Sequence, residues 1–492
     1  MGSLETSFRV LDDTMPDDTS LPAFMVSKTR GFLPRMDPIV QLPPDFDVLE
    51  SILQRMPIKT KSGAPGLLAQ GRLGDTVVQE LLDLTDAVDK HKTNLPLVNA
   101  LYRDYSFLAS AYLLEPCHQR FVRDEPYGLG RSVLPAIIAR PIARCAEICG
   151  FKPFMEYAGS YALYNYRLQD PALGLQYSNL RLIRAFEHGL DPSSSEAGFV
   201  LVHVDMVRNS GPLVAGTMAC LDACAAARTS SPPSSPQSSQ MVHRRALNSG
   251  LSTILASLRR INAVMETMWA KSKPASYTQF RTFIFGITSQ SMFPSGVVYE
   301  GVGGGDDGEK PMSFRGESGA NDSMIPLMDN LLAIRMPDTP LTEILRDFRQ
   351  YRPSNHREFL GWVYGRSRGV GFRGWALGEE GGGEMGEMRA EVDKSRRLWL
   401  GVLDQVRDFR WRHWCFAREY ILKRTSHPTA TGGSPIVTWL PNQLQAVLGE
   451  MDGLYEGLGG QCEDIMEVVR RQKETLEKEV RKYCEERGVA AA

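Results

Sequence analysis

The feature that most constrains this chain is a long stripe of apolar side chains near its C-terminal end. Between Leu398 and Ile421 these residues recur at steps of mostly three and four, and a second such stripe follows Pro441, which predicts a helix that begins at this proline. Such steps occupy one face of an α-helix, whereas a half-buried strand alternates every second residue. Hairpin signals are almost absent, so the sequence predicts an all-α fold. The first stripe consists of Leu403, Val406, Phe409, His413, Phe416, Ala417 and Tyr420.

Further helices are predicted in the N-terminal half. Thr76–Lys90 carries an apolar side after Gly74-Asp75, and similar patterns cover about Leu97–Leu114 and Leu134–Cys149. The run FVLVHVDMV at Phe199–Val207 is apolar throughout, so its pattern fits either a strand or a buried helix. Its helical neighbours favour a helix.

Four segments outside these helices have distinctive compositions. The Ser/Pro stretch TSSPPSSPQSSQ at Thr229–Gln240 is of low complexity and is predicted to be disordered. The Gly-rich stretches Gly301–Pro311 and Gly369–Gly386 are predicted to be loops, and the charged tail Gln472–Arg487 a solvated helix.

The composition excludes several classes of protein. The 492 residues include 56 Lys plus Arg and 58 Asp plus Glu, a formal net charge of -2, so no nucleic-acid partner is expected. Hydrophobic residues make up 42%, which is enough for a large core. The eight cysteines form no CxxC pair, the N-terminus lacks the pattern of a secretory signal, and no run of about 18 apolar residues occurs. We therefore expect a cytoplasmic protein with reduced thiols and no membrane contact.

His413 is unusual because it lies on the apolar stripe of a long helix, in RDFRWRHWCFAREYI. One interpretation is a core histidine with its hydrogen bonds satisfied, which spacing alone favours. The other is an axial haem ligand, because a neutral imidazole on a rigid helix can bind iron through one nitrogen. Arg410, three residues earlier, would then share nearly the same face and could pair with a haem propionate.

Arg281 is a second unusual residue, since SYTQFRTFIFGI surrounds it with Phe280, Phe283, Ile284 and Phe285. A buried guanidinium requires a partner. The sequence leaves open whether that partner is a carboxylate of the protein or the carboxylate of a substrate, which an arginine can bind through two parallel hydrogen bonds.

Several separate motifs occur in one order along the chain. They are FRTFIFG (280–286), GVVYEG (296–301), FRGESGANDS (314–323), LMDNLLAI (327–334), YRPSNHREFL (351–360), RWRHWCFAREYI (410–421) and TGGS (431–434). Together they resemble the indoleamine 2,3-dioxygenase family, over about Gly31 to Gly459. The resemblance implies a flexible arm at residues 1–28, a small α domain at 29–190 and a large haem-binding catalytic α domain at 191–492, which would contain the disordered insertion at 229–240.

The resemblance also implies one haem b per chain. In this family pattern His413 matches the proximal iron ligand and Arg410 the arginine near a haem propionate. Ser318 lies in the loop over the haem edge, and Asp329 matches the aspartate that supports the proximal side.

The substrate positions follow from the same resemblance. Arg281 matches the arginine that binds the substrate carboxylate, and Tyr157 and Phe199 match aromatic positions that line the indole pocket. Thr431 and Gly432 match the mobile loop that closes over the ligand.

His203 departs from the best-known mammalian members, which carry a small hydroxyl residue there, and resembles the distal histidine of tryptophan 2,3-dioxygenase. We therefore expect a catalytic-site histidine that accepts a hydrogen bond from the indole N–H or donates one to bound dioxygen. The alternative is a packed histidine bonded to the backbone. A second departure is Ser276, which replaces an aromatic residue, although Tyr277 keeps the adjacent ring.

The function implied is a haem dioxygenase that inserts O2 across the indole C2–C3 bond of L-tryptophan and yields N-formylkynurenine, the first step of the kynurenine route toward NAD. Alternatives are a paralogue that acts on another indole and a non-catalytic haem or oxygen-binding protein. Arg281 argues against the last, because an oxygen carrier needs no carboxylate anchor. A monomer with no partner beyond substrate and O2 is expected.

Overall fold

The computed structural model of the chain describes residues 7–189, 191–229, 236–303, 310–336, 340–379, 386–425, 427, 429–456 and 462–488. Most regular structure in these ranges is helical, so the predicted all-α fold is confirmed. The strands found there are short. β1 (Val133–Leu134) pairs in parallel with β4 (Val298–Tyr299), and β2 (Tyr166–Leu168) pairs antiparallel with β3 (Leu180–Leu182).

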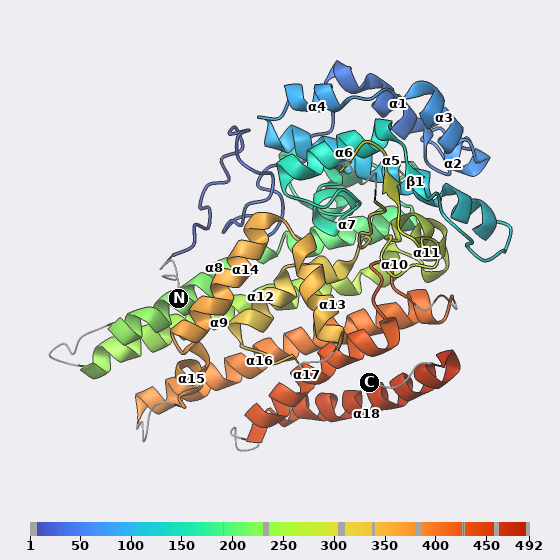
Figure 1. Ribbon diagram of the computed structural model, residues 1–492. Coiled ribbons are helices and arrows are strands. Elements are labelled where there is room, and N and C mark those ends of the chain that lie inside the picture. The colour runs from blue at the N-terminus through green and yellow to red at the C-terminus, as the bar shows by residue number, and fades with distance from the viewer. Residues whose placement is uncertain are drawn as a thin grey trace.

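The N-terminal part of the chain forms a group of helices around α5 (Leu95–Phe121), at the top of Figure 1. The side chain of Asn94 begins this helix by accepting a hydrogen bond from the Leu97 amide at 3.1 Å. α5 is buried on nearly every side. The surrounding helices are α1 (Asp47–Arg55), α2 (Leu67–Gln70), α3 (Leu73–Glu80), α4 (Thr85–Lys90) and α6 (Ala136–Cys149).

Long helices form the other part of the molecule, which fills the lower half of Figure 1. α9 packs between α8 and α16, and α17 packs between α16 and α18. Asn262 on α9 donates to the Gln405 carbonyl on α16 at 3.0 Å, which ties these two helices together. Their bounds are α7 (Ser195–Val207), α8 (Ser210–Thr229), α9 (Pro236–Glu266), α16 (Glu387–Phe416), α17 (Ile436–Glu456) and α18 (Glu463–Arg487).

Short helices connect these two groups. They are α10 (Met268–Lys271), α11 (Pro274–Arg281), α12 (Met324–Leu331), α13 (Pro340–Phe348), α14 (Ser354–Gly369) and α15 (Phe372–Leu377), with 3-10 turns at Pro44–Phe46, Pro171–Leu173, Tyr177–Asn179, Thr282–Ile284, Gly319–Asn321 and Arg349–Tyr351 and π-turns at Tyr157–Tyr161 and Ala417–Leu422. One continuous apolar cluster, from Ala23 to Cys484, runs through all of these layers. The division into domains at residue 190 therefore stays a prediction.

The arm at residues 1–28, predicted to be flexible, is packed in its described part. Phe24 and Val26 are buried. The fully buried guanidinium of Arg35 holds this segment by donating to the carbonyls of Pro22 at 2.9 Å and Leu21 at 3.0 Å. The sequence could not reveal this, because the partners of Arg35 are backbone oxygens.

Two predicted helix boundaries are wrong. Thr76–Lys90 is not one helix, because the backbone becomes extended at Leu81 and a new helix begins only at Thr85, whose amide donates to the Asp83 carboxylate at 3.0 Å. Pro441 does not open its helix: α17 already begins at Ile436, and the proline lies inside it.

The segments predicted to be disordered or to form loops also differ in part from the structure. Residues 230–235 lie outside the described ranges, but Pro236–Gln240 already belong to α9, so the prediction of disorder is wrong there. Gln240 fixes this first turn by donating to the Ala227 carbonyl at 3.0 Å. The predicted loop at 369–386 contains the helix α15. Residues 380–385 of this loop and residues 304–309 of the predicted loop at 301–311 lie outside the described residues.

The predicted helices at Phe199–Val207 and in the C-terminal tail are both present. The tail Gln472–Arg487 is not wholly solvated, because it buries Leu476, Tyr483 and Cys484, and its Glu479 accepts from Trp414 on α16 at 2.6 Å.

The segment Ser195–Thr229 is long and apolar enough to cross a membrane by length and composition, yet 61% of its most apolar window is buried inside the fold. A core helix of a globular protein meets the same criterion.

A buried ion cluster lies beneath the N-terminal helices. Asp104 on α5 accepts from Arg103 at 2.7 Å and from Arg184 at 2.8 Å, and the Asp104 carboxyl is fully buried. Burial raises the pKa of this carboxyl, but the two arginines outweigh burial and hold the pKa at about 2. The ionised form is therefore the one that the fold uses.

We predict that Asp104→Asn lowers the free energy of unfolding by about 3–5 kcal/mol, because it leaves buried arginine charge uncompensated. The ionised carboxyl contributes its full stability above its unfolded pKa of about 3.9, and this contribution is lost as the pH falls to about 2. Urea unfolding at several pH values should show this loss in the parent and not in the variant. Glu80→Gln, which removes an exposed pair with Arg55, should change stability far less.

Candidate functional site

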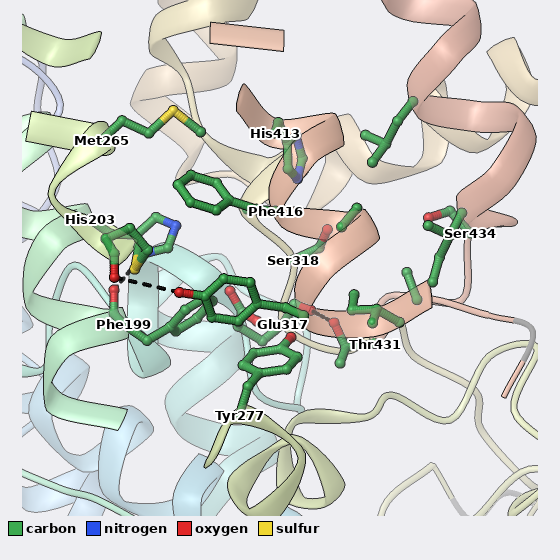
Figure 2. Close-up of a pocket in the computed structure, with 18 of the residues that line it drawn as sticks. Phe199, His203, Met265, Tyr277, Glu317, Ser318, His413, Phe416, Thr431 and Ser434 are labelled. Carbon is green, nitrogen blue, oxygen red and sulfur yellow. Dashed lines mark hydrogen bonds between the residues drawn. The ribbon is translucent and has the colours of Figure 1, made fainter. Parts of the chain in front are cut away.

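Two cavities meet at His413, which lines both together with Gly319 and Trp439. The first, here called the apolar pocket, has a volume of about 130 Å³ and lies beside the C-terminal end of α16 (Figure 2). The second, the arginine-lined cavity, has a volume of about 780 Å³, within the range of sites for small ligands and cofactors. Seven arginines line it: Arg335, Arg346, Arg349, Arg352, Arg357, Arg368 and Arg410.

His413 lies at the point where α16 loosens into the π-turn Ala417–Leu422, and its carbonyl accepts from the Ala417 amide. Burial, with smaller effects from His203 and Arg410, lowers the pKa of the His413 imidazole to about 4. The ring is therefore neutral at physiological pH and carries a lone pair that can bind a metal. The sequence allows His413 to be either a core histidine or a metal ligand, and the two cavities that it lines support the metal ligand.

His203 on α7 lies in the same pocket (Figure 2). Its Nδ1 is 2.8 Å from the carbonyl oxygen of Phe199, which can only accept, so Nδ1 carries the proton. Burial lowers the pKa of this imidazole, and the ring is neutral. Nε2 then carries a lone pair. This atom lies near Gly319 in the pocket lining, since a Cβ at Gly319 would be 3.7 Å from it. The bond to the backbone thus fixes the tautomer and leaves the other nitrogen as an acceptor.

Aromatic rings form one wall of the apolar pocket. The ring of Phe199 packs at 5.4 Å from Tyr277, and Tyr277 packs at 5.6 Å from Tyr420, measured between centroids. Tyr157 does not line the pocket as predicted. It lies behind His203, with an edge-to-face contact at 5.6 Å, because it belongs to the buried π-turn Tyr157–Tyr161. Tyr157 can therefore orient His203 but not contact a ligand directly in this arrangement.

Arg410 and Asp329 face each other in the arginine-lined cavity. Nη2 of Arg410 donates to both carboxylate oxygens of Asp329, at 3.0 and 2.7 Å. Nε and Nη1 of Arg410 are buried and have no hydrogen-bond partner. Such donors favour an anionic group in the cavity. A haem with its propionates on this side and its iron at His413 fits these residues.

Arg281 at the end of α11 has no carboxylate partner among the described residues. Its Nη2 donates to the Thr429 carbonyl at 3.0 Å, the guanidinium stacks at 4.5 Å over Phe285, and Nε and Nη1 are buried without partners. Of the two alternatives left open by the sequence, the internal salt bridge is therefore not found among the described residues. Arg281 does not line the pocket but lies next to Tyr277, which does.

Two loops close the pocket on the side opposite α7. Thr431 donates through Oγ1 to the Glu317 carbonyl at 2.8 Å, and Ser318 and Thr431 both line the pocket. Gly432 does not line it. A Cβ at Gly432 would lie 2.7 Å from the Phe348 ring and 3.2 Å from Ser318, so this glycine allows the two loops to approach.

Glu317 is a pocket residue that sequence reasoning missed (Figure 2). Its side chain is buried, Oε1 has no hydrogen-bond partner, and burial raises the pKa of its carboxyl to about 8. The sequence did hold a signal, since the segment FRGESG places the charged side chains of Arg315 and Glu317 among small residues.

Comparison with known proteins adds a further finding. The profile of a family described as "Indoleamine 2,3-dioxygenase" matches residues 20–475. The chain is 26% identical over 233 residues to indoleamine 2,3-dioxygenase 1 of Rattus norvegicus, which covers 47% of this chain and 51% of that one. It is 28% identical over 316 residues to indoleamine 2,3-dioxygenase of Saccharomyces cerevisiae, a match that covers 60% of this chain and 61% of the relative. It is 25% identical over 361 residues to 6-hydroxytryptophan 2,3-dioxygenase of Fusarium equiseti, a match that covers 72% of this chain and 75% of the relative. The matched part thus spans about half the length of the rat relative.

We predict that His413→Ala abolishes the Soret band of the purified protein or greatly reduces its haem content, because no iron ligand then remains at the junction of the cavities. Absorbance spectra and a pyridine haemochrome assay measure this. The control is His118→Gln, another buried histidine that lines neither cavity and that should leave the spectrum unchanged. Full haem with an unchanged ferrous–CO spectrum in His413→Ala would refute the ligand assignment.

Proposed function

Because the chain belongs to the indoleamine 2,3-dioxygenase family, we propose that it is a haem-dependent dioxygenase that adds O2 across the C2–C3 bond of an indole amino acid. The observation that carries the proposal is the position of His413, a neutral imidazole between an apolar pocket and an arginine-lined cavity. L-tryptophan, with N-formylkynurenine as product, is the proposed substrate.

Haem dependence is a property of the family. In this chain His413 would hold the iron, the free nitrogens of Arg410 would pair with a propionate, and Ser318 would lie over the haem edge. Asp329 would keep Arg410 in place. When bound, the haem supplies the activation of dioxygen toward the electron-rich indole ring.

The apolar pocket would bind the indole and exclude water. Phe199, Tyr277 and Tyr420 offer ring faces and edges to it, and the loop with Thr431 covers it. A pocket that holds the indole in one orientation beside the reacting oxygen would lower the entropic part of the activation barrier. The reaction consumes no external reductant in each turnover, so the residues need only bind and orient the two reactants.

His203 would orient the indole through its N–H. Because Nδ1 is occupied by the Phe199 carbonyl, Nε2 can accept the indole proton in a hydrogen bond. The structure gives His203 no free N–H in this tautomer, so of the two roles expected from the sequence we favour the acceptor.

Two observations keep a second candidate substrate open. One relative carries the name 6-hydroxytryptophan 2,3-dioxygenase, and Glu317 puts a carboxyl into the pocket wall. An indole with a modified ring or side chain is thus the alternative.

The direct test is an assay of the haem-loaded, reduced protein with L-tryptophan in air. Formation of N-formylkynurenine, followed by its absorbance and by mass spectrometry, is the expected result. Stable haem and oxygen binding without product from tryptophan or substituted tryptophans would point to a non-catalytic haem protein.

We predict that His203→Ser leaves haem binding intact and weakens tryptophan binding or turnover by about 0.5–1.5 kcal/mol, the net value of one hydrogen bond. Methylation of the indole nitrogen should harm the parent more than the variant, because only the parent has the acceptor. Steady-state kinetics with L-tryptophan and 1-methyl-L-tryptophan compare the two. Equal sensitivity of both proteins would leave His203 as a packing residue.

We predict that Arg281→Ala lowers kcat/KM for L-tryptophan about tenfold or more, because a charge-assisted hydrogen bond is worth about 1.5–3 kcal/mol. Haem content should stay normal, since Arg281 lines neither cavity at His413. Unchanged kinetics would show that the guanidinium only supports the Thr429 carbonyl and the Phe285 ring.

A further inference from the structure

Glu317 is a buried acid without a counter-charge. It is 2% exposed, it lines the apolar pocket, and no ion pair joins it to a basic residue among the described residues. Burial alone accounts for its raised pKa, with no basic group acting on it. A carboxyl in such a setting lacks a partner that water would otherwise provide, and a ligand in the pocket can supply one.

The backbone around Glu317 is held on both sides. Its carbonyl accepts from Thr431, and the backbones of Gly286 and Gly316 are in contact, since a Cβ at Gly286 would lie 2.0 Å from the Gly316 nitrogen. Arg315 adds a bond to the Gly432 carbonyl at 3.0 Å. The backbone that carries the carboxyl is therefore held in a fixed position beside the pocket.

The groups near this carboxyl are phenols. Glu317 raises the pKa values of Tyr157, Tyr161 and Tyr277, in each case as an addition to burial. Arg281 acts on Tyr277 in the opposite direction. Tyr277 thus interacts with the guanidinium of Arg281 and with the carboxyl of Glu317, each of which has a buried polar atom without a partner.

These two side chains match the two charges of an amino acid. On the proposed function, Arg281 would bind the substrate carboxylate, and the ammonium group would be left close to the same region. A carboxylate is the partner that a desolvated ammonium requires, and a bound ammonium would in turn favour the ionised form of Glu317, which burial alone disfavours. We propose that Glu317 binds the ammonium group of the substrate and so selects zwitterionic indole amino acids over indoles that lack the amine. This inference rests on the proposed function and names a specificity-determining residue for it.

The test is calorimetric binding to the haem-loaded ferric protein, with L-tryptophan, tryptamine and indole-3-propionate as ligands. Glu317→Gln keeps the shape and removes the charge. It should weaken binding of the two ammonium-bearing ligands about tenfold or more and that of indole-3-propionate less than about twofold. The matched control is Glu196→Gln, another fully buried acid with its pKa raised to about 8 that bonds to the Phe186 and Glu187 amides outside the pocket. Glu196→Gln should leave the relative affinities for the three ligands unchanged.

Each outcome has a separate meaning. Equal losses for all three ligands, or none, would overturn the role of Glu317. Glu317→Ala and the Tm of each variant distinguish a local effect from unfolding. If the amines bind in a Glu317-dependent manner but no N-formylkynurenine forms, the proposed reaction fails and the ammonium site stands. If product forms and Glu317→Gln binds tryptophan like the parent, only the ammonium site fails.

Discussion

The packing of α16 is the constraint on which the rest of the site depends. This helix of 30 residues lies between α9 and α17, and side chains such as Asn262 bind its backbone from α9. Its regular hydrogen bonding continues to Phe416, where the π-turn Ala417–Leu422 begins. The imidazole of His413 is thereby held in the last turn of a packed helix, where it lines both cavities. A rigid position for a metal ligand is what an iron site requires.

Two sets of buried charged side chains among the described residues differ in how they are paired. In the first, charges are matched within the protein: Asp104 is held by Arg103 and Arg184, and Glu115 accepts from Arg131 and from the amides of α3. In the second, Arg281, Arg410 and Glu317 keep buried polar atoms without partners. The first group stabilises the fold, whereas the members of the second lie at or beside the cavities around His413. Because Arg410 and Glu317 line these cavities, a ligand bound there can supply partners for their polar atoms.

The two loops over the pocket act as one unit. Gly286 donates to the Thr431 carbonyl at 2.9 Å, Ile287 donates to Phe314 at 2.7 Å, and Gln290 donates to Ala430 at 2.8 Å. Arg281 is bonded to Thr429 in the same segment. A movement of residues 429–434 on ligand binding would therefore alter the surroundings of Arg281, Glu317 and Ser318 together.

The sequence by itself determined the all-α class and the candidate pair of histidines, because apolar spacing and residue chemistry are local properties. For Phe199–Val207 the pattern fitted a strand or a helix, and only its helical neighbours favoured the helix that the structure contains. The sequence also indicated Arg281 as a buried cation in need of a partner. It could not determine where helices begin and end, as at Leu81, where α3 has ended, and at Ile436, where α17 begins ahead of Pro441. Only the tertiary structure decided that Tyr157 lies behind His203, that Nδ1 of His203 is used by a carbonyl, and that Glu317 faces the pocket without a counter-ion. These facts depend on which segments meet across long stretches of chain, and burial and hydrogen-bond partners are set by that meeting and not by the neighbouring residues in the sequence.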